Sequence, residues 1–328
     1  MRLLKLVPEN TNIRFLRWRV PFYAISIVLI CASWALILTK GFNYGVDFAG
    51  GQEIQATFVG EAQAPTAQLR EQLDKLGFTD PVIQGYGADN QVSIRVRLPA
   101  SAEGNPGAAD AIAKRITDTI RQEHPQVRID GVSAVSGKVS GEFRTMAIYS
   151  LLAAMLAISI YIWVRFEWQF GVGALFALFH DVSLTLGMFS LFGMQFDLQI
   201  VAAILAIVGY SLNDTIVVYD RIREDLKKYR RMPLPELLDM SVNETLARTV
   251  MTSATLLVAL IPLLFFGPES LFGLTAAIVL GIFVGTYSSI YMAAPILIWL
   301  GVRSDSFVKT ESEMDRQERL ARERSAKP

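Results

Sequence analysis

The chain has 328 residues, of which 52% are hydrophobic, and its formal net charge is zero. That hydrophobic share exceeds what one soluble core of this size needs, so the composition argues against a purely soluble protein. The apolar residues gather in runs of about 20 residues with few charges, the length that crosses a bilayer core about 30 Å thick. Six transmembrane helices are predicted, at residues 20–39, 146–164, 170–193, 198–219, 247–266 and 271–300.

The charges that flank these runs predict the orientation of the chain. Residues 1–19 hold five Lys or Arg against the single acid Glu9, and the segment 220–246 holds six. Such basic flanks tend to stay in the cytoplasm, so both segments and the charged tail 301–328 are expected there. The first run is too long for a secretory signal and lacks a small-residue cleavage pattern, so it is interpreted as a membrane span. Its Cys31 is the only cysteine, which excludes an internal disulfide.

Residues 40–145, between the first two spans, change period as a soluble α+β domain does. The patterns predict a strand at 46–58, a helix at 69–76, strands at 82–83 and 92–98, a helix at 112–120 and a strand from 127. This βαββαβ order predicts a ferredoxin-like domain on the periplasmic side of the membrane. His124 precedes a proline at a predicted helix end and is interpreted as a solvated or capping residue rather than a metal ligand.

Three ionisable residues, Asp181, Asp214 and Arg248, fall within or beside the predicted spans. Each costs about 2.5–3.5 kcal/mol at a helix centre, so each needs an explanation. Asp214 and Arg248 lie at similar depths on neighbouring antiparallel helices, where an ion pair is plausible. A static pair or an Arg248 that reaches the headgroups is one interpretation. A proton site, in which protonation of Asp214 releases Arg248, is the other.

Further polar and small residues surround this place in the sequence. Asn213 and Asp181 are second-rank candidates for a proton pathway, with His180 beside Asp181. Small or polar residues follow one side of the fourth span, and a small-xxx-small pair stands in the sixth. These are Ala202, Ala206, Gly209 and Asn213 in the fourth span, and Gly281 and Gly285 in the sixth. Simple helix packing and sliding helices both fit this pattern.

The run GYSLNDTIVVYDRIRE at 209–224 resembles the signature of SecF proteins, a family of protein-export membrane proteins. Three other segments are similar to the same family. They are Asp-Phe-Ala-Gly-Gly at 47–51, which resembles a motif shared by SecD and SecF, His-Asp-Val at 180–182 and Leu-Ala-Arg-Thr at 246–249. The resemblance covers nearly the whole chain.

This resemblance implies a subunit that pairs with SecD in a twelve-span assembly akin to the resistance-nodulation-division transporters. It implies association with the SecYEG channel in the bacterial inner membrane, with YajC, YidC, the exported unfolded protein and lipid as further partners and no nucleic acid. Protons are the implied coupling ion, with no cofactor, no metal and no enzymatic activity. Asp214 and Arg248 match the family's proton-pathway pair. The residues that match its structural motif are Asp47, Phe48, Gly50, Gly51 and Gly209.

Three other functions compete with this one. A proton-coupled small-molecule efflux half-transporter shares the six-span layout, but the external domain here is small for that class. An intramembrane aspartyl protease is suggested by Tyr219-Asp220, yet the second aspartate after a Gly-x-Gly arrangement is missing. A passive assembly subunit stays open, because a static ion pair and a working one look alike in sequence.

Overall fold

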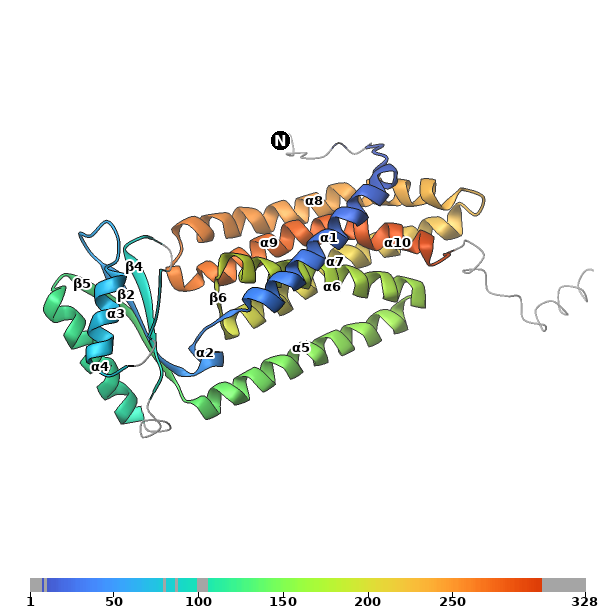
Figure 1. Ribbon diagram of the computed structural model, residues 1–328. Coiled ribbons are helices and arrows are strands. Elements are labelled where there is room, and N and C mark those ends of the chain that lie inside the picture. The colour runs from blue at the N-terminus through green and yellow to red at the C-terminus, as the bar shows by residue number, and fades with distance from the viewer. Residues whose placement is uncertain (1–7, 9–10, 79–80, 86–87, 99–105, 303–328) are drawn as a thin grey trace, which may run out of the picture.

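The computed structural model describes residues 8, 11–78, 81–85, 88–98 and 106–302. Long helices run side by side, and a four-stranded sheet with two helices lies at one end of them (Figure 1). The two ends of the described chain, near residues 11 and 302, both lie at the end opposite the sheet (Figure 1). This placement agrees with an even number of crossings.

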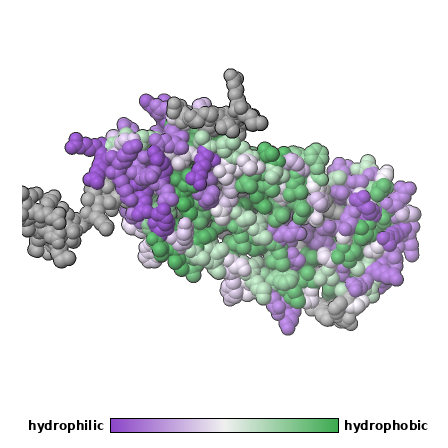
Figure 2. All heavy atoms as spheres, turned by 180° about the vertical axis from the view of Figure 1, so that it is seen from behind, coloured by the Kyte–Doolittle hydropathy of each residue, from purple (hydrophilic) through white to green (hydrophobic). Residues whose placement is uncertain are grey.

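Within the described residues, six helices are long and apolar enough to cross a membrane. They are α1 (Arg19–Lys40), which follows the short helix η1 (Phe15–Trp18), α5 (Gly137–Arg165), α6 (Trp168–Phe192), α7 (Leu198–Lys228), α8 (Leu234–Phe266), and a last helix made of α9 (Phe272–Ser288), the π-helical turn η3 (Ser289–Ala293) and α10 (Ala294–Trp299). Apolar side chains cover the middle of the molecule and hydrophilic ones cover both ends (Figure 2). The predicted multi-pass fold with six membrane helices is confirmed.

Two of the helices are longer than the apolar runs suggested, since α7 ends later and α8 begins earlier. The segment 220–246, predicted as a basic loop, is helical except for residues 229–233. The prediction stopped where charges appear, whereas α7 and α8 continue as amphipathic extensions. Their apolar side chains join the main core, and these are Ile222, Leu226, Leu237, Leu238 and Val242. Ser241 lies inside α8, and its hydroxyl donates to Asp225 of α7 at 2.7 Å.

The sheet domain (residues 51–135) follows the predicted order of strands and helices. Its elements are β2 (Gly51–Phe58), α3 (Thr66–Lys75), β3 (Val82–Gly85), β4 (Gln91–Val96), α4 (Pro106–Glu123) and β5 (Val127–Val135). The strands pair antiparallel in the order β3-β4-β2-β5, which is compatible with a ferredoxin-like arrangement. Apolar side chains of β2 and β4 pack with those of α3 and α4, among them Ile54, Ile94, Leu69 and Ile116.

One predicted strand begins later than expected. Val46 and Phe48 were assigned to it from their alternation, but they lie in the short helix α2 (Val46–Ala49). Gly50 and Gly51 follow with φ of 70° and 116°, which breaks the extended chain before β2 starts. His124 has its imidazole Nδ1 2.9 Å from Glu61 and its ring edge against Phe58.

The helices differ in how much of their surface this chain covers. Most buried residues of the helical part belong to α6, α7 and the last helix. In contrast, α5 runs along one side of the bundle (Figure 1). It exposes large apolar side chains along its length. Examples are Met146, Leu152, Leu156, Trp163 and Val164. This surface is suited to lipid or to helices of another subunit.

Candidate functional site

Asp181 is the centre of a buried polar cluster that joins three helices. It lies on α6 with no exposed surface, and its Oδ2 accepts hydrogen bonds from Ser211 of α7 at 2.5 Å and Ser288 of α9 at 2.8 Å. Its Oδ1 is 2.9 Å from Nδ1 of the neighbouring His180. Both carboxylate oxygens therefore have partners, as a buried polar group requires.

Asp214 lies one helical turn after Ser211 on α7 and is only 2% exposed. Its Oδ2 is buried and has no hydrogen-bond partner among the described residues. Beside it, the Tyr210 hydroxyl bonds to Ser253 of α8 at 2.6 Å, and Ser253 bonds to Thr286 of α9 at 2.8 Å. A buried carboxylate oxygen without a donor is costly when charged, so the energy of this site depends on whether Asp214 carries a proton.

Arg248 is exposed on α8 and does not form the ion pair that the sequence suggested. Among the described residues, no salt bridge joins it to Asp214. It lines a cavity of about 550 Å³ together with Arg165, Asp220 and Glu244. A long cationic side chain that extends toward the polar end of a helix agrees with the alternative in which Arg248 reaches the headgroups.

The small residues of the two helices have different surroundings. Gly281 and Gly285 of α9 pack on α7, since a Cβ atom would overlap Ile207 at the first position and lie 3.2 Å from Ser211 at the second. The small stripe of α7 is exposed in this chain, and consists of Ala202, Ala206, Gly209 and Asn213. The α9 glycines thus serve internal packing, while the α7 stripe leaves room for the close approach of another helix.

The predicted structural motif lies where the chain passes from α1 to the sheet domain. Asp47 Oδ2 accepts a hydrogen bond at 3.1 Å from the amide of Leu198, the first residue of α7. A carboxylate at this position is favourable because the N-terminus of a helix carries partial positive charge. Phe48 is buried and packs on Phe196, with ring centroids 5.8 Å apart.

The two motif glycines allow close packing as well as positive φ. A Cβ atom on Gly50 would lie 3.2 Å from Ser140 Oγ at the start of α5, and one on Gly51 would lie 2.5 Å from the carbonyl oxygen of Val96. Any side chain here would separate elements that now touch. Four of the five motif residues therefore lie together, while Gly209 lies apart, on the exposed stripe of α7.

A second strand pair, which the sequence did not predict, completes this region. The short strand β1 (Asn43–Tyr44) pairs in parallel with β6 (Gln195–Phe196), which lies in the turn between α6 and α7. The amide of Gly45 continues the pairing with a bond of 2.9 Å to Phe196 O. We call residues 41–50 together with 193–198 the junction, because they join the sheet domain to the outer end of α7.

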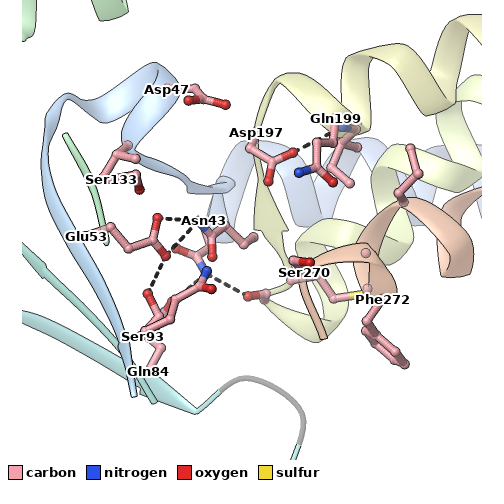
Figure 3. A pocket seen from close by; sticks show the side chains of 18 of the residues that line it. Asn43, Asp47, Glu53, Gln84, Ser93, Ser133, Asp197, Gln199, Ser270 and Phe272 are labelled. Atoms are coloured by element: carbon pink, nitrogen blue, oxygen red, sulfur yellow. Dashed lines mark hydrogen bonds between the residues drawn. The ribbon is translucent and has the colours of Figure 1, made fainter. Parts of the chain in front are cut away.

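A cavity of about 420 Å³ lies between the sheet domain and the turns of the helical part. Three carboxylates line it, those of Asp47, Glu53 and Asp197 (Figure 3). Asp197 caps α7 by accepting from the amide of Ile200 at 3.1 Å. Burial raises the pKa of Asp197, and the negative charges of Asp47 and Glu53 raise this pKa further. Within the described part of the chain, no group of three His, Cys, Asp or Glu has the spacing to hold a metal ion.

Two protein families match this sequence. Residues 115–303 match the family described as protein export membrane protein SecD/SecF, C-terminal. Residues 35–61 match the SecD/SecF GG motif, the segment that contains Gly50 and Gly51. Together these matches include the junction, α5 to α10 and the candidate residues in the membrane helices.

Similar proteins carry names that agree with these families. A protein translocase subunit SecF from Rhodobacter capsulatus is 42% identical over 94% of this chain and 95% of that protein. One from Cereibacter sphaeroides is 44% identical over 91% and 93%. One from Haemophilus influenzae is 38% identical over 92% and 90%.

Solved structures extend the similarity to three dimensions. The structure of SecDF from Thermus thermophilus, described as a translocon-associated membrane protein, superimposes with a TM-score of 0.80 at 33% identity, covering 90% of this chain and 39% of that one. SecDF in a super-membrane-facing form gives 0.65 at 31% identity, covering 98% and 41%. The present chain thus spans about two fifths of the SecDF chains that it resembles.

Proposed function

Because this chain belongs to the SecD/SecF family of protein export membrane proteins, we propose that it acts with SecD in protein translocation. In this proposal the pair uses the proton-motive force to promote passage and release of exported proteins through the SecYEG channel, in contact with YajC and YidC. The chain lies in the bacterial inner membrane with both termini in the cytoplasm and the sheet domain outside. The observation that carries the proton step is the buried, unpartnered oxygen of Asp214.

Asp214 suits a proton-coupled movement because its surroundings do not stabilise a single protonation state. Protonation would remove the cost of a buried charge on α7, and deprotonation would favour an approach of Arg248 or another donor. The same helix begins at the junction, where Asp47 and β6 connect it to the sheet domain. A change in the position of α7 can therefore be transmitted to the sheet domain through these direct contacts.

The available energy is adequate for such a movement. One proton that crosses about 150 mV supplies about 3.4 kcal/mol, at about 2.3 kcal/mol per 100 mV. This energy shifts a two-state equilibrium by about 300-fold, since each factor of ten takes about 1.4 kcal/mol. A single proton can thus drive a movement of α7 between two positions whose free energies differ by less than this amount.

The exposed stripe of α7 supports the pairing with SecD. Small residues in the middle of a membrane helix permit close approach of a second helix. Apart from the backbone of the same helix, none of the described residues lies within 4 Å of a Cβ atom placed on Gly209. Asp214 follows this stripe on the same helix. The proton site would then lie beside the surface shared with SecD, where relative movement of two subunits could change its surroundings.

Export measured by pulse-chase tests the proposal. Cells depleted of their own SecF would receive this chain, together with a matched SecD, or its Asp214→Asn variant at equal membrane abundance. We expect wild type to restore export and Asp214→Asn to reduce it at least tenfold. Asp220→Asn is the control, since it removes a half-exposed carboxylate from the same helix. Equal export by wild type and Asp214→Asn would reject a proton role of Asp214 and favour a passive assembly subunit.

A further inference from the structure

The sheet domain contacts the α6–α7 turn through one pair of side chains. Among the described residues, the hydrogen bonds from strands β2 to β5 to this turn all join Glu53 of β2 to Gln195 of β6. Gln195 Nε2 is 3.1 Å from both carboxylate oxygens of Glu53 (Figure 3). Ser93 of β4 donates to the same carboxylate at 2.5 Å. We call the Glu53–Gln195 contact the clasp.

The Glu53 side of the clasp is buried, Gln195 is half-buried, and the chain around them leaves room for the contact. Glu53 is only 3% exposed, in a region where hydrogen bonds to a charged group are stronger than in water. Gly45 makes room for the amide, because a Cβ atom there would lie 2.9 Å from Gln195 Nε2. Ser93 holds the carboxylate from the neighbouring strand, so Glu53 cannot turn away without losing a second bond.

The other contacts of the junction start from the linker 41–50 rather than from the sheet. Asn43 Nδ2 donates to the carbonyl oxygen of Gly193 at 3.0 Å, and Asp47 accepts from Leu198. Arg95 of β4 donates to Asn43 Oδ1 at 2.5 Å and to the carbonyl oxygen of Tyr44, so it connects the sheet to the turn through the linker. Among the hydrogen bonds of the described residues, the clasp alone joins a sheet side chain to the turn directly, two residues before the cap of α7.

From this arrangement we propose that Glu53 and Gln195 are positioning residues that hold the sheet domain to α7, so that displacement of α7 moves the domain. The role of this contact in export rests on the proposed function, whereas the contact itself does not. Without the clasp, the domain stays connected to the helices through the linker and through residue 136, which joins β5 to α5. Gly50 and Gly51, where the linker enters β2, have two successive positive φ values. The domain would then pivot while α7 moves.

Distances between two spin labels test the clasp in the full chain with its SecD partner in membranes. One label is placed at Asp118→Cys on α4 and the other at Pro268→Cys between α8 and α9, both exposed, in a Cys31→Ala background. Glu53→Leu and Gln195→Leu each remove the clasp. Glu53→Gln keeps the shape and one acceptor oxygen. Gln55→Leu is the control, because Gln55 lines the same cavity from the same strand.

We expect a narrow distance distribution in wild type, Glu53→Gln and Gln55→Leu, and a distribution at least twice as wide in both clasp-breaking leucine variants. Export should fall at least threefold in the same two variants and stay within error in the others. If the leucine variants gave the same spin-label distance distribution as wild type, the proposal of the clasp would be rejected. A widened distribution in Glu53→Gln would also overturn it, because this variant keeps one acceptor oxygen for the Gln195 amide.

The two proposals fail in different ways. If Asp214→Asn blocks export while the leucine variants keep a narrow distribution, the proton role stands and the clasp is wrong. If Asp214→Asn exports normally and the leucine variants widen the distribution, the clasp exists but does not serve a proton step at Asp214.

Discussion

Two buried aspartates on neighbouring helices differ in how their oxygens are satisfied. Asp181 has partners for both oxygens, from Ser211, Ser288 and His180. Asp214, one turn from Ser211, leaves one buried oxygen without a partner in the described structure. A satisfied carboxylate fixes the packing of the helices around it, whereas an unsatisfied one responds to protonation. This difference supports a structural role for Asp181 and the proposed proton role for Asp214.

Gly51 combines a positive φ with very little room for a side chain. Its φ of 116° costs an L-residue about 1–3 kcal/mol, and a Cβ atom 2.5 Å from Val96 O forces β2 and β4 apart as well. We expect Gly51→Ala to lower the melting temperature of the purified protein and to reduce export. Gly77→Ala is the matched control, because Gly77 also has positive φ, 86°, but none of the described residues beyond its chain neighbours lies within 4 Å of its Cβ position. Equal melting temperatures for the two variants would show that the contact with Val96 does not matter.

Among the elements, α8 is held at its charged end by the segment that precedes α1. The side-chain amide of Asn243 accepts from the Ile13 amide at 2.9 Å and donates to the Ile13 carbonyl at 2.8 Å. Asp239 accepts from the amide of Leu16 at 2.9 Å. The N-terminal segment is thus fixed to the helix that carries Arg248.

Removing Asn243 should release this segment. Asn243→Ala loses the two side-chain hydrogen bonds to Ile13, worth about 0.5–1.5 kcal/mol each. The population in which the N-terminal segment is detached from α8 should therefore rise about tenfold. Cleavage by trypsin at Arg14 and Arg17 should then become about tenfold faster, because cleavage follows the open population. Asn213→Ala, at an exposed position on α7, should leave the rate unchanged. Unchanged cleavage in Asn243→Ala would mean that the segment is held by other contacts.

At the scale of the whole molecule, the junction cavity makes stability depend on pH. Because the folded protein raises the pKa of Asp197, the stability from this group is complete at low pH and is lost as pH rises through the raised value. Asp197→Asn still caps α7 but cannot ionise. We expect its melting temperature to exceed that of wild type by an amount that grows from acidic to neutral pH. Asp118→Asn, exposed on α4, should show no such trend, and a difference independent of pH would contradict the assignment.

The sequence was sufficient for features that depend on local patterns. Runs of bilayer length predicted the six helices, and changes of period predicted the order of elements in the sheet domain. Charges inside apolar runs identified Asp181, Asp214 and Arg248 as candidates. These signals do not depend on how distant segments meet.

Features that depend on tertiary packing were missed. The strands β1 and β6 have two residues each, too few for any periodic signal, and the charged extensions of α7 and α8 look like a loop until their apolar faces are seen together. Whether Arg248 pairs with Asp214 depends on the direction of the Arg248 side chain, and the sequence does not show this direction. Glu53 and Gln195 carry no motif, since a Glu in a strand and a Gln in a turn are common.

The pairing of β1 with β6 also sets an order of events during synthesis. Asn43 pairs with Gln195, 152 residues later, which at about 5–20 residues per second leaves the ribosome about 8–30 s afterwards. By then the sheet domain, complete at Val135, has long been synthesised. Its attachment to the α6–α7 turn therefore follows the synthesis of the domain, and a chain arrested before β6 would carry the domain on a linker without its partner strand.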